Sequence, residues 1–231
     1  MADIEEIFGI KTDNKELFES AVTHPSYTQE KGLDYTKCYE RLEFLGDAVL
    51  KLVISNILFR EFPAYHEGDM SKIRSIAVSD SVLSEISKEI GLADIITASN
   101  HDTKQGIQKL ESVTACAFEA VLGAYFLDGK MKKLEKKLDK LFAPYIKEIN
   151  ANMDKYNAKA LLQEYTQSLT KETPKYRLTG ESGPAHNKVF TVEVLYKGEV
   201  IAQAQGKSKK EAEQKCAYLA CRKMGVLECQ K

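Results

Sequence analysis

The sequence lacks any run of apolar residues long enough to cross a membrane. A spanning helix needs about 18 or more consecutive apolar residues, and no window of the 231 residues approaches that length. The first residues, MADIEEIFGIKTDNKELF, are acidic early and contain no basic segment followed by an apolar one, so a secretory signal is not expected. The only cysteines are Cys38, Cys116, Cys216, Cys221 and Cys229, and no two of them form a CxxC pair. We therefore expect a reduced, cytoplasmic chain with no structural zinc site and no membrane partner.

A large net charge is also missing. With 43% hydrophobic and 29% charged residues and a net charge of −1, the composition is that of a folded globular protein and not of a disordered chain. The total hides an asymmetry, because residues 157–231 contain 13 Lys and Arg against 8 Asp and Glu, and residues 1–156 contain 20 against 26. The front therefore carries −6 and the back +5, which indicates two modules with different partners.

The front of the chain has the hydrophobic spacing of helices. Apolar residues recur at steps of three and four, and the segments that show this are residues 16–21, 38–59, 71–78, 81–90, 111–127 and 131–149. Residues 111–127 are apolar nearly all round, which places that helix at the centre of a domain. The polar, glycine-containing stretch 100–108 predicts a mobile loop. Residues 1–150 are thus expected to form an all-α N-terminal domain.

The back of the chain follows a different pattern. Residues 151–157 contain Asn, Asp and Lys without an apolar run, which predicts a flexible linker. A short helix over 158–169 is followed by strand-like segments at 175–179, 189–196 and 199–205, with a turn at Lys197-Gly198, and by a closing helix over 208–223. The order helix–strand–strand–strand–helix predicts a small α+β (α-β-β-β-α) domain over residues 158–228.

Three acids interrupt the apolar pattern of the long helix predicted over residues 38–59. Glu40, Glu43 and Asp47 fall at i, i+3 and i+7, which puts them along one face. Their spacing alone fits equally well a solvated face balanced by Arg41. Gly46 favours a functional reading, because a glycine inside a helix costs about 1 kcal/mol and often marks the close approach of another backbone.

A further acid, Glu119, lies in the apolar helix expected over residues 111–127. Acids in such surroundings are costly unless they bind a metal or a base. Oxygen ligands from two helices suit Mg²⁺ or Mn²⁺, the ions typical of phosphodiester hydrolysis.

These residues carry a resemblance to a known family. The run ERLEFLGD at residues 40–47 closely resembles the signature of ribonuclease III, the family of double-strand-specific endoribonucleases. Three further stretches match in order: THPSY at 23–27, EGDMS at 67–71 and FEAVLGA at 118–124. The resemblance continues through the basic module and so covers nearly the whole chain.

The resemblance implies a homodimeric helical nuclease with an active-site valley across the dimer. The family's metal ligands map onto Glu43, Asp47 and Glu119, with Asp47 and Glu119 catalytic, while Glu40 and Glu67 match supporting acids. The implied reaction is Mg²⁺- or Mn²⁺-assisted hydrolysis that leaves 5′-phosphate and 3′-hydroxyl ends and a short 3′ overhang, in the processing of ribosomal and other structured RNA.

Two positions depart from the family pattern. Cys116 stands where the family has a metal-binding Asp, three residues before Glu119, and a neutral thiol is a poor ligand for Mg²⁺. The usual glycine-rich segment with Arg or Lys is only partly preserved at residues 104–111. A cysteine in an apolar helix also fits simple core packing. In either case weaker metal binding than in the family is expected.

The basic module resembles a double-stranded-RNA-binding domain. By that resemblance Gln163 and Glu164 enter one minor groove, and the loop with Gly183, Pro184 and His186 enters the next. Lys207, Lys209 and Lys210, at the start of the last helix, would contact phosphates across the intervening major groove. The lysines alone would fit a solvated turn as well.

Two functions therefore stay open at this point. The first is a divalent-metal-dependent endoribonuclease acting on double-stranded RNA, which the retained Glu43, Asp47 and Glu119 favour. The second is a homologue that binds double-stranded RNA with weak or no cleavage, which the replacement at Cys116 favours.

Overall fold

The chain folds as two units, Met1–Glu148 and Ile149–Lys231. The structure, a computed structural model, describes residues 4–183 and 188–227. Within these residues, no helix combines the length and the apolar character that crossing a membrane requires. The first unit is helical and the second combines helices with an antiparallel sheet, so the predicted fold class is confirmed.

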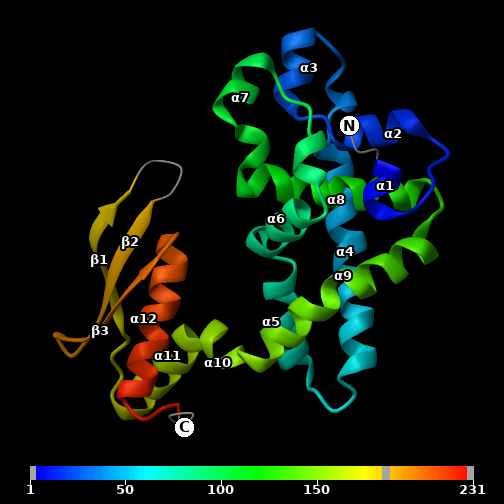
Figure 1. Cartoon of the computed structure of the whole chain (residues 1–231). Helices are drawn as coiled ribbons and strands as arrows, with labels where there is room; N and C mark the ends of the chain where they lie inside the picture. Colours follow the sequence, from blue (N-terminus) through cyan, green and yellow to red (C-terminus); the bar gives the residue numbers. More distant parts are fainter. Residues whose placement is uncertain (1–3, 184–187, 228–231) are drawn as a thin grey trace. The chain divides into compact units, whose positions relative to one another are not determined.

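The first unit is built around helix α8, Glu111–Leu127 (Figure 1). Side chains on every side of α8 are buried, as its uniformly apolar sequence predicts. The long helix α4, Glu40–Glu61, packs along it, and α6, Asp80–Glu89, packs on another side. The other elements of this unit are α1 (Ile4–Phe8), α2 (Lys15–Ala21), α3 (Pro25–Lys31), η1 (Tyr35–Lys37), α5 (Glu67–Ala77), η2 (Leu92–Ile95), α7 (Asn100–Gln105) and η3 (Ile107–Lys109). Helix α9 (Met131–Ala151) begins in the first unit, and its last three residues belong to the second.

The prediction of a mobile loop over residues 100–108 is wrong. These residues form α7 and the 3-10 turn η3. Ser99 caps α7, because its hydroxyl accepts a hydrogen bond from the Asp102 backbone N–H at 3.1 Å. Gly106 ends the helix in the left-handed conformation, with φ of 72°. Cap chemistry therefore stabilises a helix for which the hydrophobic pattern is too weak.

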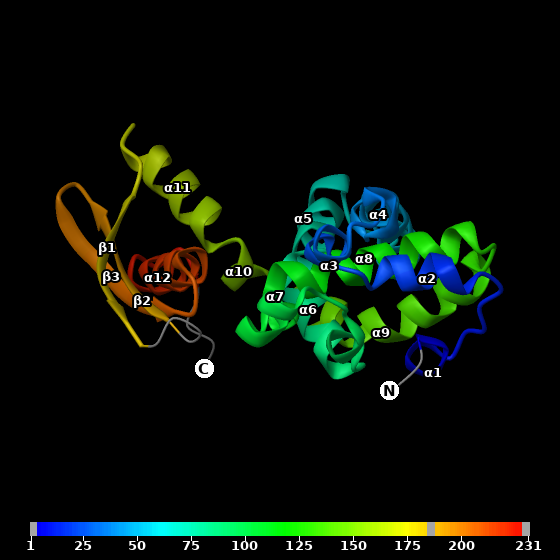
Figure 2. The same ribbon diagram turned by 90° about the horizontal axis from the view of Figure 1, so that it is seen from above.

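The second unit places two helices on one face of a three-stranded sheet (Figure 2). The strands β1 (Lys175–Ser182), β2 (Val189–Tyr196) and β3 (Glu199–Gly206) pair antiparallel in the order β1-β2-β3. Helices α11 (Ala158–Leu169) and α12 (Lys209–Lys223) supply the core together with β2, through Leu162, Val194 and Cys216 among others. Residues 151–157, expected as a flexible linker, include the short helix α10 (Met153–Tyr156).

Candidate active site

Two glycines let α4 and α8 cross with their backbones in contact. A Cβ on Gly46 would lie 1.7 Å from the Glu119 carbonyl oxygen, and a Cβ on Gly123 would lie 2.3 Å from the Leu42 carbonyl oxygen. No side chain larger than hydrogen fits at either place. The interpretation of Gly46 as a point of close backbone approach is therefore confirmed. This crossing brings the acids of α4 next to Glu119 of α8.

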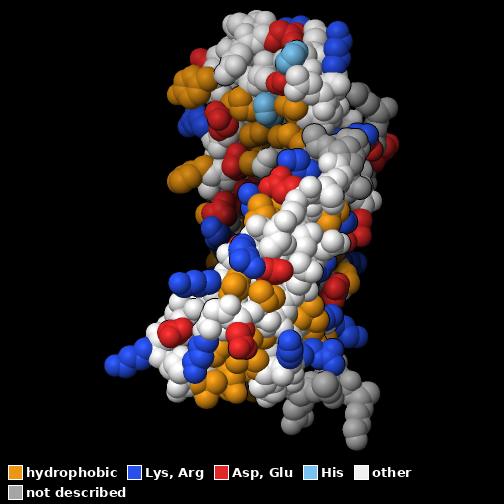
Figure 3. Space-filling model, turned by 90° about the vertical axis from the view of Figure 1, so that its left-hand side faces the viewer, with side chains coloured by type: hydrophobic (Ala, Val, Ile, Leu, Met, Phe, Trp, Pro, Cys, Tyr) orange, Lys and Arg blue, Asp and Glu red, His pale blue; other side chains and the backbone are white. Residues whose placement is uncertain are grey.

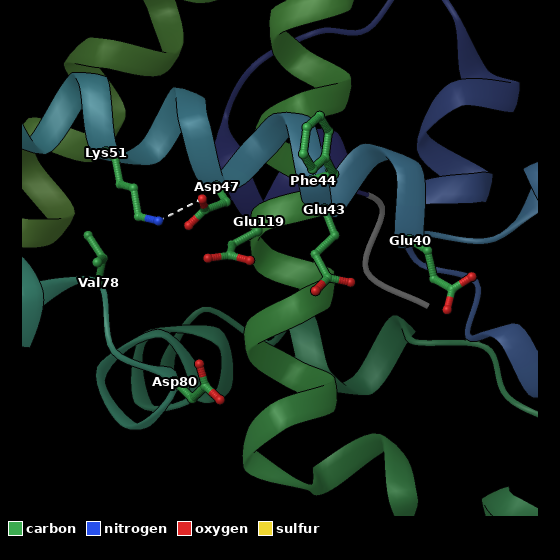
Figure 4. A pocket seen from close by; sticks show the side chains of 8 residues that line it. All are labelled: Glu40, Glu43, Phe44, Asp47, Lys51, Val78, Asp80 and Glu119. Carbon is green, nitrogen blue, oxygen red and sulfur yellow. Dashed lines mark hydrogen bonds and ion pairs between the residues drawn. The ribbon is translucent and has the colours of Figure 1, made fainter.

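The acids line a hollow of about 590 Å³ on the first unit. Its lining residues are Glu40, Glu43, Phe44, Asp47, Lys51, Val78, Asp80 and Glu119 (Figure 4). Four of the acids come from α4 and α8, and Asp80 comes from the first turn of α6. Five carboxylates thus surround the hollow with a single ammonium group, that of Lys51. All three residues that the family resemblance assigns to the metal, Glu43, Asp47 and Glu119, line this hollow, and so does Asp80, which the sequence does not single out.

The carboxylates of the hollow differ in their partners. Asp47 forms an ion pair with Lys51 at 2.7 Å, drawn as the dashed line in Figure 4. No ion pair holds Glu43, Asp80 or Glu119 within the described part of the chain. Burial, reinforced by the charges of Asp47 and Glu43, raises the pKa of Glu119 to about 8. Burial also raises the pKa of Glu43. The raised pKa values mean that ionisation of these acids is unfavourable without additional positive charge in the hollow.

Cys116 touches the site through Glu43. The thiol is half-buried on α8, and its interaction with the Glu43 carboxylate lowers the pKa of Glu43 against the effect of burial. Burial, together with Glu43 and Glu119, raises the pKa of Cys116 to about 12, so the group is a neutral thiol at pH 7. A neutral thiol is a poor ligand for a hard cation. Cys116 thus packs beside the acids, and its thiol does not supply the cation ligand that a carboxylate at this position would supply.

The supporting acids lie in different surroundings. Glu40 lines the hollow, and its carboxylate accepts a weak hydrogen bond from the Cys38 thiol at 3.7 Å. Glu67 lies in the first turn of α5 and accepts a hydrogen bond from the Ser71 hydroxyl at 2.6 Å. Among the described residues, Glu67 is not one of the side chains that line the hollow. The structure therefore brings Glu40 to the candidate site and leaves Glu67 outside it.

The donor set of the hollow fits a hard divalent cation in its chemistry. Every acid offers oxygen, and the uncompensated negative charge of the group favours a bound cation. The side chains are not closed around one point, because no three His, Cys, Asp or Glu groups of the described residues form a ready coordination shell. One oxygen of Asp47 contacts Lys51, so a cation held by Asp47 would compete with that ammonium group.

The candidate RNA-binding residues lie at the surface of the second unit. Gln163 and Glu164 are exposed on α11, and Gly183 is exposed at the end of β1 with φ of 86°. Pro184 and His186 lie outside the described residues. Gly206, which precedes the lysines, must be glycine, because a Cβ there would lie 2.5 Å from the Ala212 backbone nitrogen.

The lysines after β3 are exposed at the start of α12. Lys207, Lys209 and Lys210 all reach solvent, and the Lys209 ammonium lies 3.6 Å from Glu181. Figure 3 shows Lys and Arg side chains projecting from the surface of the second unit. Because Ser208 caps α12 by accepting a hydrogen bond from the Glu211 backbone N–H at 3.2 Å, the helix begins directly beside these lysines.

Comparisons with known proteins match both units. Residues 14–146 match the family model described as ribonuclease-III-like, and residues 158–224 match the model of the double-stranded RNA binding motif. The chain is 38% identical to "Ribonuclease 3" of Desulfotalea psychrophila over 224 residues, which are 96% of this chain and 92% of that protein. It is 40% identical to "Ribonuclease 3" of Syntrophomonas wolfei over 204 residues, 88% of this chain and 86% of that protein.

A solved structure is similar to the first unit. The nuclease domain of ribonuclease III from Campylobacter jejuni has 31% sequence identity and a TM-score of 0.56, and the match covers 63% of this chain and 97% of that one.

Proposed function

The chain belongs to the ribonuclease III family of double-strand-specific endoribonucleases, and from this premise we propose that the hollow between α4, α6 and α8 is its cleavage site. The single observation that carries the proposal is the convergence of Glu43, Asp47 and Glu119 at the glycine-mediated crossing of α4 and α8. Backbone contact at that crossing fixes the two helices against each other, so the acids keep one arrangement.

The family's dependence on divalent metal gives these acids a role. Glu43, Asp47 and Glu119 would hold the cation, which is Mg²⁺ or Mn²⁺ in this proposal, and Glu40 would support them. When bound, the cation lowers the pKa of a water molecule and neutralises charge on the scissile phosphate. Asp47 and Glu119 are the carboxylates that we assign to the catalytic step. The expected products carry 5′-phosphate and 3′-hydroxyl ends.

The second unit would deliver duplex RNA to this site. The side chains that would meet the grooves and the phosphates are all exposed: Gln163, Glu164, Lys207, Lys209 and Lys210. Recognition of this kind depends on the A-form shape and the 2′-hydroxyl groups more than on sequence. Ribosomal and other structured RNAs contain such duplexes, and we propose them as substrates in the cytoplasm.

The alternative, a duplex-binding protein without turnover, is not favoured. A site without selection for chemistry need not keep three acids beside a helix crossing, where their mutual repulsion and burial are unfavourable. Relatives that carry the name of the nuclease match most of the chain.

Substrate choice is the test of this proposal. The intact chain with Mg²⁺ should cut a labelled RNA duplex of about two helical turns, because a double-stranded-RNA-binding domain spans about 16 base pairs. The single strand of the same sequence and the matching DNA duplex should stay intact. Equal cleavage of the single strand, or no cleavage of any of the three in either Mg²⁺ or Mn²⁺, would contradict the proposal.

We also propose that the protein works as a homodimer through α4. Phe44, Leu52 and Phe59 are 83%, 62% and 73% exposed, and their spacing puts them on one side of the helix. An exposed apolar stripe of this kind is typical of a contact surface. The nuclease domain of the Campylobacter jejuni protein shows structural flexibility in a region involved in its own dimer formation.

Light scattering at micromolar concentration tests the dimer. The intact chain should have the mass of two copies, and Leu52→Glu should shift it to one copy. Leu169→Glu, at a residue 55% exposed on the second unit, is the matched control and should remain a dimer. A monomeric intact chain would rule out α4 as a dimer surface.

A further inference from the structure

Asp80 is an acid of the hollow that comes from a third helix. It is the first residue of α6, and it is exposed where it lines the hollow together with Glu43, Asp47 and Glu119. Figure 4 shows its carboxylate on the side of the hollow opposite α4. Within the described part of the chain, no basic side chain forms an ion pair with Asp80. Its oxygens are therefore available to a group that occupies the hollow.

Helix α6 packs beside the part of α8 that carries position 116. The Ser87 hydroxyl of α6 donates a hydrogen bond to the Thr114 carbonyl of α8 at 3.1 Å, and the Ser84 and Thr114 hydroxyls lie 2.7 Å apart. Asp80 begins the same helix and lines the hollow with Glu119. Asp80 thus puts negative charge beside the turn of α8 from which the family's carboxylate is missing.

A simpler explanation for Asp80 is its place in the helix. An aspartate in the first turn interacts favourably with the helix dipole wherever that helix lies. This explanation accounts for an acid at position 80. It does not account for an acid without an ion pair that lines a hollow with four other acids, where like charges are unfavourable unless a cation balances them.

We infer that Asp80 is a positioning residue that supplies, from α6, the negative charge that Cys116 cannot supply from α8. This inference rests on the proposed function. Mg²⁺ keeps several of its own water molecules when proteins bind it. Asp80 would accept hydrogen bonds from those waters, and the acids of α4 and α8 would contact the cation itself. The chain would in this way retain cation binding despite the neutral thiol at 116.

The test measures binding of Mn²⁺ to the intact chain without RNA. The electron paramagnetic resonance signal of free Mn²⁺ reports how much of the ion is bound. Asp80→Asn should weaken binding about tenfold, the lower end of what outer partners of a metal contribute. Asp94→Asn is the matched control, since Asp94 is also an exposed aspartate in the first turn of a helix, η2, and lies outside the hollow. It should bind Mn²⁺ as the unchanged chain does.

The same substitution in a chain that also carries Cys116→Asp shows whether Asp80 compensates for the missing carboxylate at 116 or only adds negative charge to the hollow. If Asp80 stands in for the missing carboxylate, then Asp80→Asn should cost about twofold or less when Cys116→Asp is also present. An equal loss in both backgrounds, or no loss in the chain with Cys116, would overturn the inference. Glu119→Gln separates failure of the proposed metal site from failure of the role of Asp80. If Glu119→Gln leaves the Mn²⁺ affinity unchanged, the proposed metal site is wrong. If Glu119→Gln weakens Mn²⁺ binding and Asp80→Asn does not, only the role of Asp80 is wrong.

Discussion

At the scale of single residues, each carboxylate of the hollow is held differently. Asp47 forms an ion pair with Lys51, Glu43 interacts with the Cys116 thiol, and Glu40 accepts a hydrogen bond from the Cys38 thiol. Glu119 has burial and like charges around it, so its pKa is raised to about 8. A site with one cationic partner among five acids is suited to a bound cation.

Cys116 gives the residue-scale prediction. Cys116→Asp should lower the Mg²⁺ concentration for half-maximal cleavage by about tenfold, because a hard oxygen replaces a neutral thiol one helical turn from Glu119. Without metal the same change should destabilise the fold, since it adds a half-buried charge beside Glu43. The measurement is the cleavage rate of an RNA duplex across a Mg²⁺ series.

Cys116→Asn is the control, because it matches the aspartate in size but adds no charge. Its Mg²⁺ requirement should stay that of the unchanged chain. Duplex binding without metal should be the same for all three proteins. An unaltered Mg²⁺ requirement in Cys116→Asp would mean that residue 116 does not face the cation.

Acids that interrupt an apolar pattern can be predicted from the sequence, whereas Asp80 cannot. The acids at positions 40, 43, 47 and 119 interrupt apolar helices, so the sequence itself points to them. Asp80 follows Ser79 at a helix start, where an aspartate is ordinary, and only the packing of α6 against α8 reveals that it reaches the hollow. Glu67 matches the family motif, yet among the described residues it lies outside the lining.

At the scale of elements, the crossing of α4 and α8 positions the site. Gly46 meets the Glu119 carbonyl directly, so any side chain at 46 must push the helices apart. Sequence could indicate this approach, because a glycine inside an apolar helix is costly without a reason. Sequence could not indicate which backbone approaches.

Gly46→Ala should therefore destabilise the first unit by about 3 kcal/mol or more, the upper range for overpacked cores. Gly68→Ala is the control, since Gly68 lies in helix α5 and a Cβ added there would meet nothing within 4 Å. That substitution should be neutral or stabilise by up to about 1 kcal/mol. Urea unfolding of both variants measures the difference, and equal stabilities would contradict the account of the crossing.

Elements without a strong hydrophobic pattern are harder to predict. Helix α8 and strand β2 have the bounds that their apolar patterns predict, because burial on every side or on alternate positions dominates there. Helix α7 has no apolar residue and depends on the Ser99 cap and on Gly106, which are local hydrogen-bonding and backbone effects. The short helix α10 has no buried residue and therefore no pattern at all.

At the scale of the whole molecule, charge and fold are divided in the same way. The acidic front of the sequence forms the unit with the hollow, and the basic back forms the unit with the exposed lysines. A phosphate backbone is attracted to the second unit and is repelled from the hollow unless a cation is bound there. That the second unit and not the first attracts phosphate could be predicted from the net charges of the two parts of the sequence, since net charge follows directly from composition.

Deleting residues 157–231 should weaken RNA binding by at least about a hundredfold at about 0.15 M salt, because phosphate contacts supply most of the affinity. The helical signal of the first unit should persist, as its core is built from its own helices. Fluorescence anisotropy with a labelled duplex and circular dichroism measure the two effects. Undiminished binding by the truncated chain would show that the second unit does not carry recognition.

The most direct test of the central claim is a comparison of Glu119→Gln with Glu111→Gln in the intact chain. Both glutamates lie on α8, but Glu119 lines the hollow and Glu111 is exposed in the first turn. Cleavage of a labelled RNA duplex in Mg²⁺ and binding of the same duplex without metal are measured for each. We predict that Glu119→Gln cuts at least about a thousandfold more slowly with unchanged binding, and that Glu111→Gln behaves as the unchanged chain. Undiminished cleavage by Glu119→Gln would contradict the assignment of the hollow as the cleavage site.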